Sequence, residues 1–140
     1  MRTYNVLSLV VVAGIVSSVL AAGVYANDAG KSGETVTLLM RKTLPDYPGK
    51  EGAIVMVEFP PGHVDTAHRH DAHVFVYVLE GAVEMQVEGG RPVTLKAGDT
   101  FYENPRDVHP LGRNLSNTKT AKLIVFFVKK QDAPFVLPPT

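Results

Sequence analysis

The sequence of 140 residues contains no cysteine, no surplus of either charge and no long run of acidic or basic residues. Without cysteine the chain uses no disulfides, which is compatible with an exported domain but does not establish export. Binding to phosphate requires a basic surplus, so a formal net charge of zero argues against nucleic acid as a partner. The length bounds the protein to one domain with a single sizeable core.

The first residues have the features of a targeting segment. Arg2 precedes an apolar run over Val6–Leu20, and Val24-Tyr25-Ala26 fits a cleavage site. We therefore expect a signal peptide over residues 1–26 and a periplasmic or secreted protein. The alternative is a retained anchor that would place the protein at a membrane, because Val6–Ala26 is just long enough to span a bilayer. The glycines and serines within the run favour cleavage.

Helical periodicity is nearly absent from the rest of the chain. Residues 27–35 are rich in glycine, serine, aspartate and lysine and are expected to form a linker. Short apolar or alternating runs bounded by turn residues then predict strands, at Val36–Arg41, Ala53–Phe59, Val74–Leu79, Val83–Glu88, Pro92–Lys96, Thr100–Glu103, Val108–Arg113 and Ala121–Lys129. Many short strands predict an all-β sandwich or barrel over 36–131. The proline-rich tail over 132–140 is expected to pack along the barrel in an extended form or to be loose.

All five histidines lie between positions 63 and 109, and four of them fall within eleven residues. In an extended chain, residues i and i+2 point to the same face, so His68 and His70 can direct both imidazoles into one cavity. His109 lies about forty residues further on, and a barrel could bring it alongside. Neutral imidazole is the commonest metal ligand, so the three histidines predict a metal site. The alternative is a set of surface histidines on a loop.

The sequence resembles the cupin superfamily between Ala53 and Val128. Its first motif is matched by a glycine, a His-x-His pair and a second glycine, and its second motif by a proline, a histidine and an asparagine: Gly62, His68, His70 and Gly81, then Gly98, Pro105, His109 and Asn114. The resemblance implies a cupin (double-stranded β-helix, or jelly-roll) barrel. It also implies a divalent transition metal, which could be manganese, iron, zinc, nickel or copper.

The chain departs from the first cupin motif at its metal-binding glutamate, because the corresponding position holds Val74. Two neighbours could compensate. His73 is one residue early and has the wrong strand parity, so it would need a bulge to become a ligand and would otherwise lie at the rim. Glu103 could be a ligand, a partner that fixes a histidine tautomer, or a catalytic general base; the alternative is a surface carboxylate. His63, which also has the wrong parity, is expected at the surface.

The second motif is one residue short between Pro105 and His109 and lacks its internal glycine. The shorter turn occurs in some metal-binding cupins, so His109 stays in the expected ligand set. Asn114 comes one residue late, and it is expected to close a turn.

These residues leave three functions open. The first is a metal-dependent enzyme, similar to a dioxygenase, lyase or isomerase, that acts on a small organic substrate. The second is a non-catalytic cupin that binds a metal or small ligand or acts as a sensor. The third is an epimerase-like cupin without a metal, in which the histidines act as acid and base. We also expect a homodimer, with Val36–Met40 and Leu123–Val128 as candidate interface segments.

Overall fold

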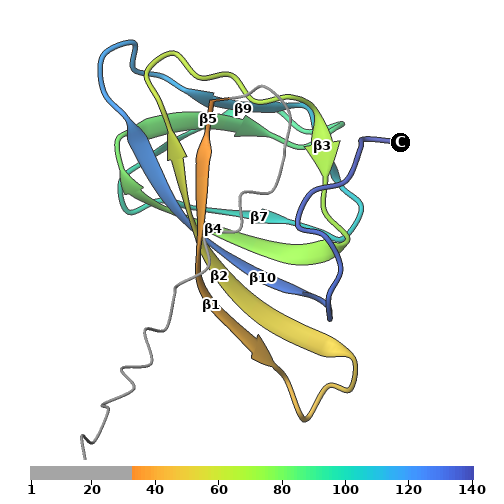
Figure 1. The fold of residues 1–140 in the computed structure, drawn as a ribbon. Helices are drawn as coiled ribbons and strands as arrows, with labels where there is room; N and C mark the ends of the chain where they lie inside the picture. The colour runs from red at the N-terminus through yellow and green to blue at the C-terminus, as the bar shows by residue number, and fades with distance from the viewer. Residues whose placement is uncertain (1–32) are drawn as a thin grey trace, which may run out of the picture.

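The computed structural model describes residues 33–140, and this part of the chain folds into ten β-strands (Figure 1). The strands are β1 (Thr35–Thr43), β2 (Lys50–Phe59), β3 (His68–Arg69), β4 (Ala72–Glu80), β5 (Ala82–Gln86), β6 (Val93–Lys96), β7 (Thr100–Glu103), β8 (Val108–His109), β9 (Leu111–Asn114) and β10 (Ala121–Lys130). The predicted signal segment 1–26 and most of the predicted linker lie outside the described residues. Within residues 33–140, no helix is long and apolar enough to cross a membrane.

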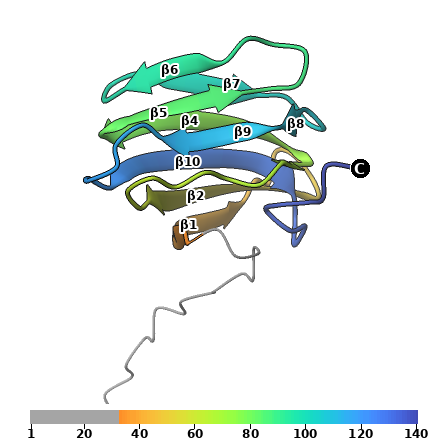
Figure 2. The same cartoon turned by 90° about the horizontal axis from the view of Figure 1, so that it is seen from above.

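The strands form three antiparallel sheets that enclose one core. The largest sheet has the order β1-β2-β10-β4-β7, and a sheet of three strands has the order β6-β5-β9. The pair β3-β8 completes the wall at one end of the space between them (Figures 1 and 2). The predicted all-β class is therefore confirmed. The predicted strand over 108–113 is divided at Pro110 into β8 and β9.

Strand β4 shows how the sequence selects the inner and outer faces of the large sheet. Alternate residues point to opposite faces of a strand, and the inward positions are small or branched apolar residues: Ala72, Val74, Val76 and Val78, all buried. The outward positions include His73, Phe75, Tyr77 and Leu79, which are exposed. At the turn into β5, Gly81 has a φ of 84°, and a Cβ there would lie 3.0 Å from the Cβ of Ala121, so the turn requires glycine.

Strand β10 lies inside the large sheet, where it pairs with β2 on one side and β4 on the other. It therefore has no free edge at Leu123–Val128 for backbone pairing with a second copy. Strand β1 is at the edge of the sheet, and Leu39 and Met40 on it are exposed. Of the two candidate segments, only Val36–Met40 keeps an edge available for pairing.

The C-terminal tail packs against the barrel and helps to close it. Leu137 and Arg69 exchange two backbone hydrogen bonds, of 3.0 Å and 2.9 Å, so the tail continues the β3 wall. The ring of Phe135 lies with its centroid 5.0 Å from that of Phe127 in β10. Of the two alternatives for residues 132–140, the structure has the packed one, with the tail running along the end of the barrel near β3 (Figure 1).

Candidate metal centre

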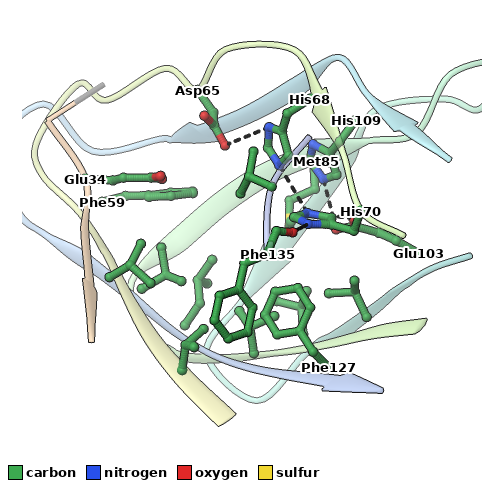
Figure 3. A pocket seen from close by; sticks show the side chains of 18 residues that line it. Glu34, Phe59, Asp65, His68, His70, Met85, Glu103, His109, Phe127 and Phe135 are labelled. Carbon is green, nitrogen blue, oxygen red and sulfur yellow. Dashed lines mark hydrogen bonds and ion pairs between the residues drawn. The ribbon is translucent and has the colours of Figure 1, made fainter. Parts of the chain in front are cut away.

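Three histidines converge at one end of the barrel interior (Figure 3). His68 in β3 pairs directly with His109 in β8, and their rings stack with centroids 5.4 Å apart. His70 follows β3, and its Nε2 lies 3.2 Å from Nε2 of His68. The predicted convergence of these three imidazoles is thus present. His70 and His109 are both buried.

A buried carboxylate completes the cluster. Glu103 at the end of β7 has Oε1 3.2 Å from His109 Nε2 and Oε2 3.5 Å from His70 Nε2. Its strand neighbour is Val74, directly opposite on β4. Residues directly opposite in an antiparallel pair point to the same face. Glu103 therefore directs its carboxylate into the same interior space as Val74, the position at which the first cupin motif has its glutamate. The expectation of a surface position for Glu103 does not hold, because the residue is 3% exposed.

Backbone carbonyls fix the tautomers of two of the histidines. Nδ1 of His68 lies 2.8 Å from the carbonyl oxygen of Thr66, and Nδ1 of His70 contacts the carbonyl oxygen of Phe135. A carbonyl can only accept a hydrogen bond, so both Nδ1 atoms carry a proton. Burial lowers the pKa of His70, although the charge of Glu103 opposes this effect. A neutral His70 therefore presents the lone pair of Nε2 to the cluster.

Several buried polar atoms of the cluster have no hydrogen-bond partner among the described residues. They are Oε2 of Glu103 and both ring nitrogens of His109. In addition, His68 Nε2 lies 3.2 Å from His70 Nε2, and because both Nδ1 atoms donate to carbonyl oxygens, a proton or another cation must lie between these two nitrogens. Unpaired buried polar groups are costly, and facing lone pairs repel each other. A cation among the four side chains would satisfy Oε2 of Glu103, one ring nitrogen of His109, and Nε2 of His68 and His70 at once, so the residues present fit a divalent metal ion.

His73 does not join this cluster, which corrects the expectation that it could supply a ligand. It lies on the exposed outer face of β4, and its Nδ1 is 2.6 Å from the hydroxyl oxygen of Tyr102. The strand continues regularly from His73 to the buried Val74 against β10, without the bulge that would turn this imidazole inward. His73 therefore lies outside the barrel interior, closer to the expected rim position than to a ligand position.

The histidine cluster lines one end of a cavity of about 80 Å³, measured as the space open to the centre of a water molecule. The cavity walls are mainly apolar side chains of the two sheets and of the tail: Val36, Val55, Val57, Phe59, Val74, Val76, Met85, Leu123, Val125, Phe127, Phe135 and Val136. Glu34 and Asp65 are the polar residues elsewhere in its lining (Figure 3). The polar part of the lining runs from the histidines through Asp65, whose Oδ2 lies 3.6 Å from His68 Nδ1, to Glu34.

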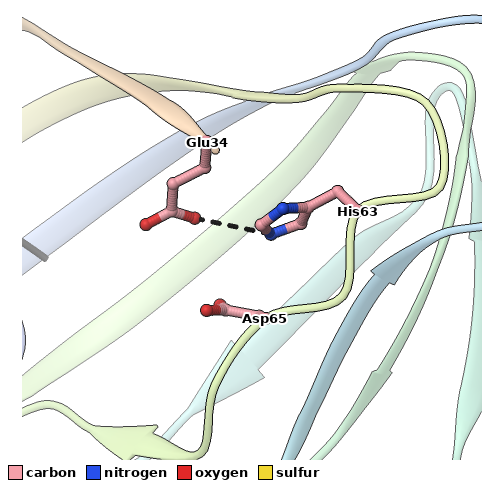
Figure 4. A group of neighbouring side chains, drawn as sticks. All are labelled: Glu34, His63 and Asp65. Carbon is pink, nitrogen blue, oxygen red and sulfur yellow. Dashed lines mark ion pairs between the residues drawn. The ribbon is translucent and has the colours of Figure 1, made fainter. Parts of the chain in front are cut away.

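A second polar cluster consists of Glu34, His63 and Asp65 (Figure 4). One ligand atom from each lies within 4.8 Å of the others, so the group could hold a metal ion. His63 is only 5% exposed, which corrects the expectation of a surface histidine. Strand parity does not apply to it, because it lies in the loop between β2 and β3. Burial, and then the charge of Asp65, raise the pKa of Glu34 to about 7.

Asn114 holds this loop in place, in agreement with the expectation that it closes a turn. Its buried side-chain amide donates hydrogen bonds of 3.0 Å, 3.1 Å and 2.7 Å to the carbonyl oxygens of Phe59, Pro60 and Lys119. Its side-chain oxygen accepts a hydrogen bond from the backbone of Ser116. Asn114 therefore ties the start of the β2–β3 loop to the β9–β10 connection.

Comparison with known proteins identifies the fold. The family model described as "Cupin domain" matches residues 55–127. A segment of 57 residues is 35% identical to the pectin degradation protein KdgF of Dickeya dadantii (strain 3937); it covers 40% of this chain and 51% of that protein, so the match spans about half of the relative.

Solved structures agree with this result. An RmlC-like cupin from Shewanella frigidimarina is 22% identical with a TM-score of 0.58, over 73% of this chain and 81% of the other. KdgF from Halomonas sp. is 24% identical with a TM-score of 0.56, over 73% of this chain and 84% of the other. At these identities the likeness shows a shared fold.

Proposed function

The chain belongs to the cupin family, and we propose that it is a metal-dependent enzyme that acts on a small organic molecule. In this proposal His68, His70, His109 and Glu103 hold one divalent metal ion. The observation that carries the proposal is the 3.2 Å approach of His68 Nε2 to His70 Nε2, while both Nδ1 atoms donate to carbonyl oxygens. Two imidazole nitrogens held this close share either a proton or a metal cation, and the adjacent Glu103 carboxylate and His109 imidazole favour the metal.

The charge of the cluster suits chemistry on a bound oxygen atom. Three neutral imidazoles and one carboxylate would leave a divalent ion with one net positive charge. A metal of this kind acts as a Lewis acid or lowers the pKa of a bound water. The chain's own contribution is to keep Glu103 and His109 in a water-poor site, where charge interactions are stronger than in water. Glu103 could also hold a proton for the reaction, but its contacts with two histidines favour a role as ligand.

The cavity supports a small and partly apolar substrate. Its walls are valine, leucine, methionine and phenylalanine, and none of its described lining residues is lysine or arginine. A highly anionic substrate would therefore lack a counter-charge apart from the metal. A molecule with an enol, phenol or carbonyl oxygen could place that oxygen at the metal and its carbon skeleton against the apolar walls. From the expected signal peptide over residues 1–26, we also propose that the protein is exported.

Metal content and turnover test the proposal together. The protein is purified without an affinity tag, its metals are measured by mass spectrometry, and enols, catechols, β-diketones and pectin breakdown products are assayed. We expect bound metal and turnover of one of these classes, with both lost in His70→Ala. His73→Ala is the matched control, because the same residue type is removed from the outer face.

Two other outcomes would contradict a metal-dependent enzyme. Tight metal binding without turnover of any class would point to a non-catalytic binding or sensor cupin. Turnover that survives complete removal of metal would contradict the metal-dependent mechanism and favour acid–base chemistry by the histidines.

A further inference from the structure

We propose that Glu34, His63 and Asp65 form a second binding site for a divalent cation, separate from the cluster around His68, His70 and His109. This inference does not rest on the proposed enzymatic function. It concerns residues that the resemblance to cupins does not include among its motif positions, and Glu34 lies before the region that matches the cupin domain.

The three side chains have the separation that one ion can bridge. Oε2 of Glu34 lies 3.9 Å from Nε2 of His63, which is too far for a hydrogen bond. Two ligands that each lie about 2.1 Å from a zinc ion can be up to about 4.2 Å apart. All three ligand atoms lie within 4.8 Å of one another. A small inward movement would therefore bring all three into contact with one ion.

The loop that carries two of these residues is pinned to β9 before any ion binds. The backbone nitrogen of Asp65 donates to the carbonyl oxygen of Gly112 at 2.7 Å, and that of Asn114 donates to the carbonyl oxygen of His63 at 3.0 Å. A Cβ on Gly112 would lie 3.4 Å from the Cβ of Asp65 and 3.5 Å from its Oδ2. The glycine therefore leaves room for the Asp65 carboxylate, and the site is preorganised.

The charge of this cluster calls for a cation. Its side chains are largely buried, with exposed fractions of 0% for His63 and 12% each for Glu34 and Asp65. Two carboxylates close together in such a place repel each other. Within residues 33–140, neither carboxylate forms an ion pair with a lysine or arginine. The charged contacts of these carboxylates are with histidines, Glu34 with His63 and Asp65 with His68. Two negative groups thus converge without a lysine or arginine, and a cation would be favoured there.

The ligand types indicate the class of ion. Calcium and magnesium prefer shells of oxygen only, whereas an imidazole with two carboxylates suits manganese or zinc. The cluster around His68 is richer in nitrogen and the cluster around Glu34 is richer in oxygen. We therefore expect Mn²⁺ to be the better probe of the second site, because oxygen-rich sites suit this ion.

Equilibrium dialysis of the metal-stripped full chain against Mn²⁺ tests the inference through stoichiometry. We expect about two ions per chain for the wild type, about one for His70→Ala and about one for Glu34→Gln, because each variant removes a ligand from one site only. Glu34→Gln keeps the shape of the side chain, and Glu34→Ala provides a second variant if the amide still coordinates. Circular dichroism checks that each variant is folded, and His73→Ala should bind as many ions as the wild type.

The outcomes separate this inference from the proposed function. If both Glu34 variants bind as many ions as the wild type, the second site is absent. If the wild type binds a single ion that His70→Ala loses, the second site is again excluded while the histidine site stands. If the single ion is lost in Glu34→Gln and kept in His70→Ala, the second site is supported and the histidine site fails.

Discussion

The two polar clusters of the cavity are held by different kinds of structure. The histidine cluster is built on paired strands, where His68 faces His109 and Glu103 faces Val74 in register. The second cluster joins Glu34, just before β1, to two residues of the β2–β3 loop. The register of paired strands sets the positions of His68, His109 and Glu103, whereas the loop depends on its backbone contacts with β9. The barrel thus has one nitrogen-rich cluster placed by strand register and one oxygen-rich cluster placed by a loop.

The clusters also differ in charge. The histidine cluster has one carboxylate shared between His70 and His109. The second cluster has two carboxylates, and the nearer one to the histidines, Asp65, has Oδ2 3.6 Å from His68 Nδ1. Asp65 therefore lies between the clusters and couples them electrostatically. Substitutions at Glu34 disturb the second cluster without touching a histidine of the first.

The largest expected effect comes from His70→Ala. This substitution removes a buried ligand and leaves Glu103 Oε2 without its neighbour, so metal affinity at the histidine cluster should fall by more than about 100-fold. Competition with a fluorescent chelator measures the change. His73→Ala should leave the affinity as it is, and an equal loss in both variants would mean that the histidines act only through stability.

The next effect concerns the carboxylate from β7. Glu103→Gln keeps the volume of the side chain but removes its charge. Loss of a residue that only supports a ligand lowers metal affinity by about 10- to 100-fold, and loss of a ligand should lower it at least as much. We therefore expect a fall of about 10- to 100-fold or more. The exposed Glu80, changed to glutamine, is the control for loss of one negative charge. Unchanged affinity in Glu103→Gln would show that the metal shell does not include this carboxylate.

A smaller effect is expected from the tail. A chain that stops after Gln131 loses the Phe135 carbonyl, which accepts from His70 Nδ1, and the ring that packs on Phe127. Metal affinity should fall by about 10-fold, because an acceptor of this kind orients the imidazole. A chain that stops after Leu137 keeps these contacts and should match the full chain in the same chelator assay. Equal affinities for both truncations would exclude the orienting role.

The smallest expected effect is a change in the stability of the metal-free protein with pH, which arises from Glu34 in the second cluster. The pKa of Glu34 is raised from 4.5 to about 7 in the folded chain, so the folded state holds this proton more tightly than the unfolded state. Its contribution to stability is complete below about pH 4.5 and is lost as the pH rises through about 7. The side chain in Glu34→Gln cannot ionise. The free energy of unfolding of this variant should therefore rise relative to that of the wild type as the pH rises.

Urea unfolding with a chelator present, at pH 5 and pH 8, measures this gain. We expect it to be on the order of 1 kcal/mol, after allowance for solvent screening of a partly exposed group. A stability difference that is the same at both pH values would show that Glu34 keeps an ordinary pKa.

Much of the barrel follows from the sequence because its signals are local. Alternation and turn residues locate the strands of the two sheets, as in Val83–Glu88 and Thr100–Glu103. The i, i+2 spacing of His68 and His70 places both imidazoles together because the chain there is extended. The same parity argument also predicts that His73 points outward.

The remaining features depend on contacts between distant segments. The role of Glu103 follows from its register opposite Val74, which no local pattern contains. Parity is misleading for His63, because the chain there forms turns instead of a strand. Glu34 lies in the predicted linker, and the Phe135 contact uses a backbone carbonyl that any residue possesses. Glu34 and the Phe135 carbonyl leave no signal in a single sequence, whereas Glu103 is a candidate there and only its choice among several roles needs the structure.

The most direct test of the central claim is a crystal structure of the protein grown with excess Mn²⁺ or Zn²⁺, with anomalous diffraction recorded at the absorption edge of the metal. The account predicts an anomalous peak about 2.0–2.3 Å from Nε2 of His68, His70 and His109 and from a carboxylate oxygen of Glu103. Metal-loaded crystals with no peak among these four side chains would contradict it.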